Sequence, residues 1–442
     1  MKRLFWSSLA IKLVMAAFIP IFADEAYYWV WSHHLQLSYY DHPAMIAWLF
    51  WLGHFLEPFA NCVRFPAVLL GHATFALWLL IMSEILPKDE RRVERLWCFA
   101  LLYLFSPFLG AGSIIVTPDI PLLFFWTLAI YFFIRLEKSP TPPNYGALGA
   151  ALGLCFCSKY NAVLFVPPLF LYLLFERRWH EVKWRYVVIT VLMGLLFSLP
   201  VLLWNYQHNF ISFRFQLSHG FHNSNYNPEW SYDYVLQELA LLFPLIVWAA
   251  LRAKPERSAR FLIYFAWFPF VFFFSSALKS FVEANWPIVG FPAVFALAVF
   301  HPRIRLFTRI YVAVFGMGLI FALAVFIFPQ LRPFSGHVAN AFEYEKLAEK
   351  LKPYKPLFTQ THQWAAALTY DMKEPIYKLR GIDRVGFYEF IPQSQPTGDH
   401  FYLLTRPDET MPEWLKAQHW EPHEIWTSKP PQYRLLEMVR DF

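Results

Sequence analysis

The chain has 442 residues, of which 57% are hydrophobic, 20% aromatic and only 16% charged. This composition excludes an ordinary soluble domain, whose surface needs more charge, and predicts a polytopic α-helical membrane protein. The net charge of +6 does not indicate nucleic acid, because Lys and Arg occur in short clusters between apolar runs and not along one face. The four cysteines lie in apolar segments and show no metal or redox spacing.

The first apolar segment, residues 4–22, has no small-residue cleavage pattern after it, so we interpret it as an uncleaved first span. The stretch that follows places Asp24, Glu25 and Asp41 where the chain leaves this segment. Aromatic residues at a membrane boundary are ordinary anchors. An adjacent Asp-Glu pair is more than anchoring requires, so the loop over residues 23–61 is the first candidate for a functional site.

Further spans are predicted wherever apolar residues run for roughly the 20 positions that cross a membrane. These segments cover residues 62–86, 96–112, 119–136, 187–204, 234–251, 260–278, 286–301 and 309–328. Residues 43–56 are apolar but short, and we expect an interfacial helix there. Residues 145–175 are too long for one span and break at Ser158-Lys159-Tyr160-Asn161.

Charge bias decides how often that last stretch crosses. The positive-inside rule assigns the basic loops to the cytoplasm. These loops contain Lys2 and Arg3, residues 88–92, 135–138, 176–185, 252–260 and 303–309. For residues 135–138 and 176–185 to share a side, the intervening stretch must cross twice and turn at Lys159. The sequence therefore predicts about 11 spans, with the N-terminus in the cytoplasm and the C-terminus outside.

From residue 329 the composition changes to a mixed soluble pattern. Helical spacing is found at residues 342–351 and 361–371, and strand patterns at 356–360, 376–379, 401–405 and 433–439. We expect a membrane domain over residues 1–328 and a small extracytoplasmic α/β domain over residues 329–442.

Charged residues of both signs remain at the outer membrane boundary, where the charge rule does not explain cations. They are Asp24, Glu25, Asp41, Asp119, Glu229, Asp233 and Glu283 among the acids, and Arg64, Lys159, Arg214 and Lys279 among the bases. Ionisable groups at membrane depth are costly and are usually paired or functional. A shared cavity explains their presence on one face.

Such a cavity suits a substrate that is half lipid and half polar, such as a polyprenyl-phosphate sugar. Cations would hold the phosphate of the leaving lipid, and a carboxylate would take the proton from the incoming hydroxyl. The reaction would be a single displacement with inversion, related in its geometry to inverting glycoside hydrolysis. The same residues could line a transporter, and periodicity and charge do not choose between these alternatives.

Five short motifs carry a resemblance to a known family. They are Asp24-Glu25-Ala26-Tyr27-Tyr28, Tyr40-Asp41-His42-Pro43, Thr117-Pro118-Asp119, Ser158-Lys159-Tyr160 and Asn285-Trp286-Pro287. In order and spacing the chain resembles the polyprenyl-phosphate-dependent glycosyltransferases of the C superfamily, in particular the bacterial relatives of protein O-mannosyltransferases and of the lipid A aminoarabinose transferase. The resemblance covers roughly the first 300 residues, and residues 358–390 look like the outer domain of this branch.

The resemblance implies roles for the acids. Asp24 would be the catalytic base or would orient the acceptor hydroxyl, with Glu25 as a partner that holds the loop. Glu25 could instead be a helix-start residue that favours the helix dipole. Asp119 matches the second acidic position of the family, and its alternative role is helix capping, because Pro118-Asp119 also reads as a helix start.

The resemblance also implies that Lys159 binds the lipid phosphate, although a lysine can extend to the interface for structural reasons. Arg214 and Lys279 are weaker candidates of the same kind. In the aminoarabinose transferase the motif corresponding to Asp41-His42-Pro43 looks like Glu-Lys-Pro, and the neutral imidazole of His42 would weaken a phosphate contact there.

Asp41 and His208 offer a carboxylate and an imidazole that could together hold a divalent metal ion. The sequence thus predicts an inverting glycosyltransferase of the bacterial inner membrane that uses a polyprenyl-phosphate-sugar donor among membrane lipids. The acceptor would be lipid A or another glycolipid, a surface glycan or a protein. A flippase for lipid-linked sugars is the alternative, although we find none of the repeated halves typical of transporters. A non-catalytic scaffold would not need Asp24.

Overall fold

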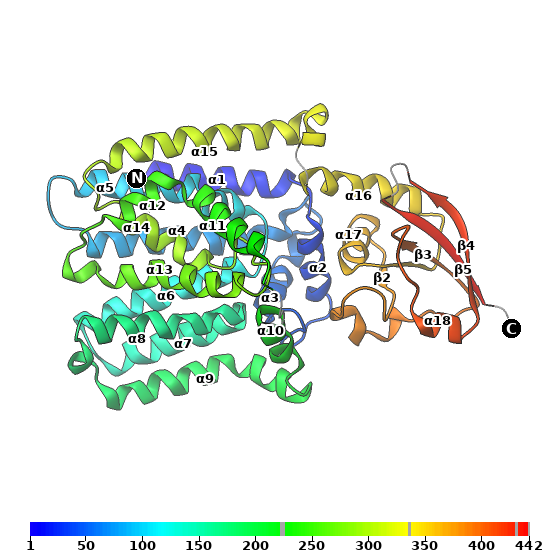
Figure 1. The fold of residues 1–442 in the computed structure, drawn as a ribbon, viewed down its shortest axis with the longest axis horizontal. Helices are drawn as coiled ribbons and strands as arrows, with labels where there is room; N and C mark the ends of the chain where they lie inside the picture. Colours follow the sequence, from blue (N-terminus) through cyan, green and yellow to red (C-terminus); the bar gives the residue numbers. More distant parts are fainter. Residues whose placement is uncertain (222–225, 335–336, 429–431, 441–442) are drawn as a thin grey trace. The chain divides into compact units, whose positions relative to one another are not determined.

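The computed structural model describes residues 1–221, 226–334, 337–428 and 432–440 (Figure 1). The chain forms two compact units. The first contains Met1–Phe18 and Gln36–Ala324, and the second contains Ile19–Leu35 and Val325–Phe442. A short segment from the expected first loop therefore groups with the C-terminal part of the chain.

The first unit is built from helices. They are α1 (Lys2–Phe18), α3 (Met45–Leu52), α4 (Phe65–Ile85), α5 (Arg92–Phe105), α6 (Asp119–Lys138), α7 (Pro142–Ser158), α8 (Val166–Phe175), α9 (Trp184–Gln207), α10 (Ile211–Phe221), α11 (Pro228–Leu242), α12 (Pro244–Leu251), α13 (Phe261–Ala277), α14 (Phe291–Ala298) and α15 (Ile304–Ile327), the last of which runs into the second unit. The predicted break of residues 145–175 at Lys159 is present between α7 and the 3-10 turn Tyr160–Phe165 that precedes α8.

Within the described residues, five helices are long and apolar enough to cross a membrane, and up to eight spans result if each bent pair counts as one. Two expected straight spans are bent, by 70° after α5 and by 87° between α11 and α12. Pro107 and Pro244 lie at these bends, and proline ends a helix because it lacks an N–H and restricts the residue before it. The first expected span, residues 4–22, ends where α2 (Ala23–Ser32) begins.

The expected span over residues 286–301 is wrong as a single crossing helix. It consists of the 3-10 turn Ile288–Gly290 followed by α14, only eight residues long. Every residue of α14 is buried, so its continuous apolar run reflects packing among other helices and not contact with lipid. A buried helix and a lipid-facing helix have the same apolar pattern, and length distinguishes them only in part.

One end of the helix bundle is held together by ion pairs between loops. Lys138 at the end of α6 lies 2.7 Å from Glu84 near the end of α4, and Arg260 lies 2.9 Å from Glu176. Arg178 pairs with Glu137. These groups belong to the basic loops that the sequence assigns to the cytoplasm, and they lie at the end of the bundle opposite the start of α6.

Helices α7 and α9 pack closely because glycine faces the neighbouring backbone. A Cβ atom at Gly149 would lie 2.2 Å from the carbonyl oxygen of Thr190, and one at Gly153 would lie 2.5 Å from that of Gly194. Small residues let membrane helices approach at backbone distance. The two helices run side by side in Figure 1.

The second unit combines helices with a five-stranded mixed sheet. The helices are α2, α16 (His337–Leu351), α17 (His362–Met372) and α18 (Glu413–Ala417). The strands are β1 (Leu357–Thr359), β2 (Tyr377–Lys378), β3 (His400–Thr405), β4 (Trp420–Thr427) and β5 (Arg434–Arg440), in the order β2-β1-β3-β5-β4. β1 is parallel to β2 and β3, whereas β5 is antiparallel to β3 and β4.

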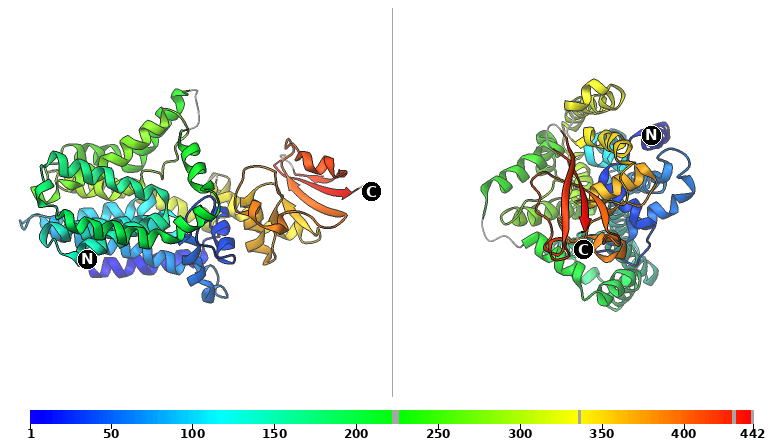
Figure 2. Two further views of the ribbon diagram at one scale, coloured as in Figure 1. Left: turned by 90° about the horizontal axis from the view of Figure 1, so that it is seen from below. Right: turned by 90° about the vertical axis from the view of Figure 1, so that its right-hand side faces the viewer.

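Alternation along the strands places a hydrophobic cluster on each face of this sheet. In β3, Leu404 packs in the cluster that includes Leu347 of α16 and Leu368 of α17, while Phe401 and Leu403 belong to the cluster on the other face. Four strands and two helices match the sequence expectation. β4 was missed because it is an edge strand with an exposed run and shows little apolar alternation; its strand is visible in Figure 2.

Candidate active site

Asp119 lies at the centre of a buried cluster in the first unit. It is the first residue of α6, and its carboxylate accepts a hydrogen bond from each of two side chains. Lys159 Nζ is 2.7 Å from Oδ1, and Asn285 Nδ2 is 2.7 Å from Oδ2. Lys159 and Asp119 are 8% and 4% exposed. Three of the five motifs therefore meet at one carboxylate, which is fixed on both oxygens.

The Tyr40-Asp41-His42-Pro43 motif is connected to this cluster through α10. Ser212 Oγ donates to the carbonyl oxygen of Tyr40 at 2.7 Å and lies 2.8 Å from Tyr160 Oη. Gln216 Nε2 donates to the carbonyl oxygen of Asp41 at 2.8 Å. Because Tyr160 follows Lys159 directly in the chain, the backbone between these two residues connects a fourth motif to the Asp119 cluster.

A cavity of about 210 Å³ borders the cluster. Asp119 and Asn285 line it together with Ser113 and Thr74, and apolar residues such as Phe108 form the rest of its wall. This volume is below the roughly 300–1,000 Å³ of a typical ligand pocket. The cavity therefore suits a small part of a substrate rather than a whole lipid-linked sugar.

The remaining basic candidates differ in how far their side chains are exposed. Arg214 is exposed on α10, between the two residues that bind the Tyr40-Asp41 backbone. Lys279 is exposed after α13, and His42 is half-buried. Arg64, expected among the outer bases, is fully buried, and its Nη1 donates to the carbonyl oxygen of Ala16 at 3.0 Å. Arg64 thus stabilises the last turn of α1.

Asp24 and Glu25 lie in the first turn of α2, in the second unit. Asp24 is exposed, whereas Glu25 is fully buried and its Oε2 accepts a hydrogen bond from the backbone N–H of Phe22 at 3.1 Å. The helix-start role considered for Glu25 is therefore present. Asp24 belongs to the second unit and Lys159 to the first. A pocket that contains both residues therefore stays a prediction.

The tyrosine after this pair anchors α2 within the second unit. Tyr27 Oη accepts a hydrogen bond from the N–H of Phe387 at 2.8 Å, and its ring lies 4.5 Å from that of His362. Trp29 packs edge-on against Tyr370 of α17. The segment 358–390, singled out by resemblance, therefore includes the residues that hold the Asp24 helix.

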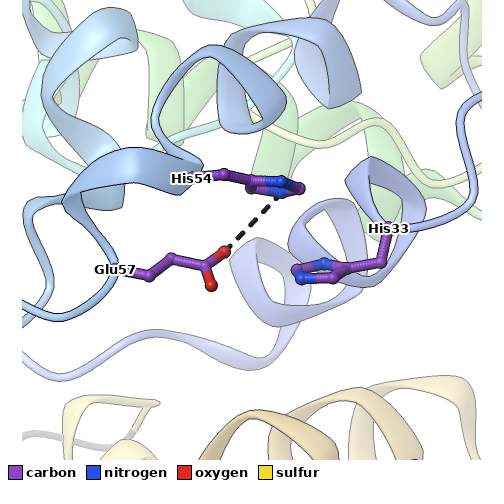
Figure 3. Close-up of side chains that lie close together, drawn as sticks. All are labelled: His33, His54 and Glu57. Atoms are coloured by element: carbon purple, nitrogen blue, oxygen red, sulfur yellow. Dashed lines mark ion pairs between the residues drawn. The ribbon is translucent and has the colours of Figure 1, made fainter.

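Of the two predicted metal ligands, His208 is held by its neighbour in α9. Its ring stacks on Trp204, and its Nδ1 bonds to the Trp204 carbonyl oxygen at 2.8 Å. The described part of this unit, however, holds no group of three His, Cys, Asp or Glu ligand atoms within 4.8 Å of one another. His54 and Glu57, drawn in Figure 3, form an ion pair at 3.6 Å. A metal at Asp41 and His208 stays a prediction.

Sequence reasoning assigned no role to Asn285, Tyr160 or Ser212. The first two stand in motifs that were recognised, but only tertiary contacts show that Asn285 binds Asp119. Ser212 lies in a polar helix without a distinguishing pattern. Its hydrogen bonds cross 172 and 52 positions of the chain, so no local signal could have identified it.

Comparisons with known proteins agree with the motifs. Residues 41–204 match the sequence model of a family described as dolichyl-phosphate-mannose-protein mannosyltransferase. The crystal structure of ArnT from Cupriavidus metallidurans bound to undecaprenyl phosphate superposes with a TM-score of 0.67 at 15% identity, over 98% of this chain and 97% of that one. The apo structure of the same protein gives a TM-score of 0.66. The chain is a membrane-embedded, polyprenyl-phosphate-dependent glycosyltransferase with the fold of the C superfamily.

Within this class, two curated relatives have sugar-specific names. The lipid A galacturonosyltransferase RgtD of Rhizobium johnstonii is 27% identical over 449 residues, which cover 93% of this chain and 92% of the relative. The undecaprenyl phosphate-alpha-4-amino-4-deoxy-L-arabinose arabinosyl transferase of Edwardsiella ictaluri is also 27% identical, over 46% of this chain and 40% of the relative. The resemblance to polyprenyl-phosphate-dependent glycosyltransferases and the enzyme class expected from the sequence are confirmed. The flippase alternative receives no support.

Proposed function

We propose that this protein transfers a sugar from undecaprenyl phosphate to lipid A at the outer face of the bacterial inner membrane. The observation that carries the proposal is the buried cluster of Asp119, Lys159 and Asn285, which the backbone from Lys159 to Tyr160 connects to the hydrogen bonds that hold the Tyr40-Asp41 backbone. It lies in a fold shared with a structure that binds undecaprenyl phosphate. The relative that spans nearly the whole chain is named for transfer to lipid A.

The proposed reaction is one displacement at the anomeric carbon. The acceptor oxygen bonds to that carbon while the bond from the carbon to the phosphate oxygen breaks, and the electron pair leaves with the lipid phosphate. Where the acceptor is a hydroxyl, Asp24 takes its proton. The leaving phosphate meets cations drawn from Lys159, Arg214, Lys279 and His42 in a partly dry site, where charge stabilisation is strong. Inversion at the anomeric carbon follows from a single displacement.

In this proposal Asp119 and Glu25 position other groups. Asp119, held by Lys159 and Asn285, fixes the ammonium beside the phosphate site, and Glu25 fixes the first turn of α2 so that Asp24 is presented at a defined place. A divalent metal held by Asp41 and His208 would supply further positive charge toward a phosphate.

The proposed topology places the N-terminus in the cytoplasm and the second unit outside. Its support is the distribution of charge in the first unit, where the basic loops and their ion pairs gather at one end of the bundle. The Asp119 network lies at the other end, where α6 begins. Basic loops remain in the cytoplasm during insertion, so the network would face outward.

The test uses purified full-length protein in proteoliposomes with an undecaprenyl-phosphate sugar and lipid A, and mass spectrometry reads the product. Asp24→Asn should lower the turnover rate by at least about 100-fold, in line with loss of a general base. Asp233→Asn is the matched control, since Asp233 is also an exposed acid near the start of a helix, and it should retain turnover. Full activity of Asp24→Asn, or no transfer to lipid A by the native protein with any donor, would refute the proposal.

A further inference from the structure

A second cavity in the first unit takes no part in the proposed reaction. Its volume is about 500 Å³, within the roughly 300–1,000 Å³ of typical ligand pockets. It is lined by residues of α6, α7, α8 and α9, most of them apolar, such as Phe133, Leu148, Leu169 and Val187. Space remains among these helices because α9 packs on α7 whereas α8 packs on α13. This cavity shares no lining residue with the one beside Asp119.

The second cavity opens on an apolar face of the bundle. Val166 and Phe170 of α8 line it and are exposed, as is Trp184 at the start of α9. Because α9 is long and apolar enough to cross a membrane, these exposed side chains face lipid. A polar molecule that entered from water would lose its hydrogen bonds against such a wall. The occupant of this part of the cavity is therefore hydrocarbon.

One edge of the cavity carries a cation and two stacked aromatic rings. Lys183 lines this edge, and its backbone N–H donates to Tyr145 Oη at 2.8 Å, which fixes the start of α9 against α7. Trp179 and Trp184 also line the cavity, and they stack with ring centroids 5.7 Å apart. Tryptophan is enriched where hydrocarbon meets lipid headgroups. This edge thus lies at headgroup level, and the apolar wall extends from it along α8 and α9.

The charge at this edge favours an anion. Arg178 is already engaged, since it forms ion pairs with both Glu137 and Glu181. Lys183 is exposed and forms no ion pair within the parts of the chain that the structure describes. The segment 176–185 contains four basic and two acidic residues, so its excess charge is positive. Basic pockets between membrane helices bind anionic lipid headgroups.

We propose that this cavity binds one anionic phospholipid of the membrane, with an acyl chain between α8 and α9 and the phosphate at Lys183. The ammonium donates hydrogen bonds to the phosphate oxygens, and the stacked tryptophans lie beside the glycerol region. The bound lipid fills the space between the helices and stabilises the folded first unit. Binding requires no sugar transfer, so this inference stands apart from the proposed function.

The first experiment compares three lipids on the native protein. The full-length protein, stripped of lipid in a neutral detergent, is titrated with phosphatidylglycerol, phosphatidylcholine or diacylglycerol with identical acyl chains, and native mass spectrometry gives the dissociation constant of the first bound lipid. Phosphatidylglycerol should bind about fivefold more tightly than phosphatidylcholine, as expected for one lysine near an anionic headgroup, and diacylglycerol should bind most weakly. Equal affinities for phosphatidylglycerol and phosphatidylcholine would overturn the proposal.

The headgroup contact is located with a pair of lysine variants. Lys183→Gln should weaken binding of the first phosphatidylglycerol about fivefold. Lys254→Gln is the matched control, because Lys254 is an exposed lysine in another basic loop and does not line the cavity, and it should bind like the native protein. An equal effect of the two substitutions would refute the contact with Lys183, and with it the proposal.

The position of the acyl chain is tested by filling the cavity. Val187→Trp places a large ring in the cavity and should abolish binding of the first phosphatidylglycerol, whereas Val188→Trp, at the adjacent exposed position outside the cavity, should retain it. Loss of binding in Val187→Trp supports the site when the variant keeps the unfolding temperature of the lipid-free native protein. Lys183→Gln leaves the cavity volume unchanged and tests the site if Val187→Trp does not fold. Native affinity in a folded Val187→Trp protein would overturn the proposal.

Discussion

Removal of Lys159 should destabilise the first unit far more than removal of an exposed lysine in an equally short ion pair. The ammonium lies 2.7 Å from Asp119 Oδ1, and the two side chains are 10% and 6% exposed. At an effective dielectric constant of about 20, the Coulomb attraction over this distance is ~6 kcal/mol. Part of it is offset by desolvation, so Lys159→Met, which leaves the Asp119 carboxylate buried beside Asn285 alone, should cost about 3–5 kcal/mol.

The matched control is Lys138→Met. Lys138 also lies 2.7 Å from a carboxylate, that of Glu84, but the two side chains are 54% and 25% exposed. An exposed pair of this kind contributes about 0–1 kcal/mol. The assay is equilibrium unfolding of the full-length protein in mixed micelles, followed by tryptophan fluorescence.

A double-mutant cycle completes this test. In Asp119→Asn with Lys159→Met, no buried charge is left alone, so the double variant should be more stable than the sum of the two single losses predicts, by roughly 1–3 kcal/mol. Transfer activity should be lost in all three variants. Two results would refute the reasoning: a loss in Lys159→Met no larger than in Lys138→Met, or strict additivity in the cycle.

Three further predictions concern the second unit and the helix packing. Glu25→Ala should lower the stability of the second unit by about 0.5–2 kcal/mol through loss of the hydrogen bond at the start of α2, measured by thermal unfolding, whereas Asp24→Asn at the exposed neighbouring position should leave it nearly unchanged. Burial lowers the pKa of His362 to about 2, while an unfolded histidine takes up its proton near 6.5. The stability that depends on neutral His362 is therefore complete above about pH 6.5 and falls by about 1.4 kcal/mol for each unit below it; His362→Gln should flatten this slope between pH 6.5 and 5, and an unchanged slope would contradict the assignment. Gly149→Ala should destabilise the packing of α7 and α9 by about 1–3 kcal/mol, while Gly318→Ala, where no atom lies within 4 Å of the added methyl group, should be neutral or slightly stabilising.

The sequence by itself determined the class of protein, most helix positions and the motifs of the site. Apolar length indicated the membrane helices, and a lysine in the middle of an apolar stretch located the break between α7 and α8, because a charge there is tolerated only where the chain turns or finds a partner. Four of the five strands were predicted from alternation. These signals are local, and each depends on only a few neighbouring residues.

Only the tertiary structure decided which side chains meet. The sequence assigned Asp119 and Lys159 to separate roles, and the structure joins them in one ion pair with Asn285, across 40 and 166 positions of the chain. It also showed that α14 is buried among helices and that α2 packs on α17. Periodicity reports whether a residue faces an apolar environment, but lipid and protein interior are equally apolar. The identity of a buried partner is set by how the helices pack, and that information is distributed over the whole chain.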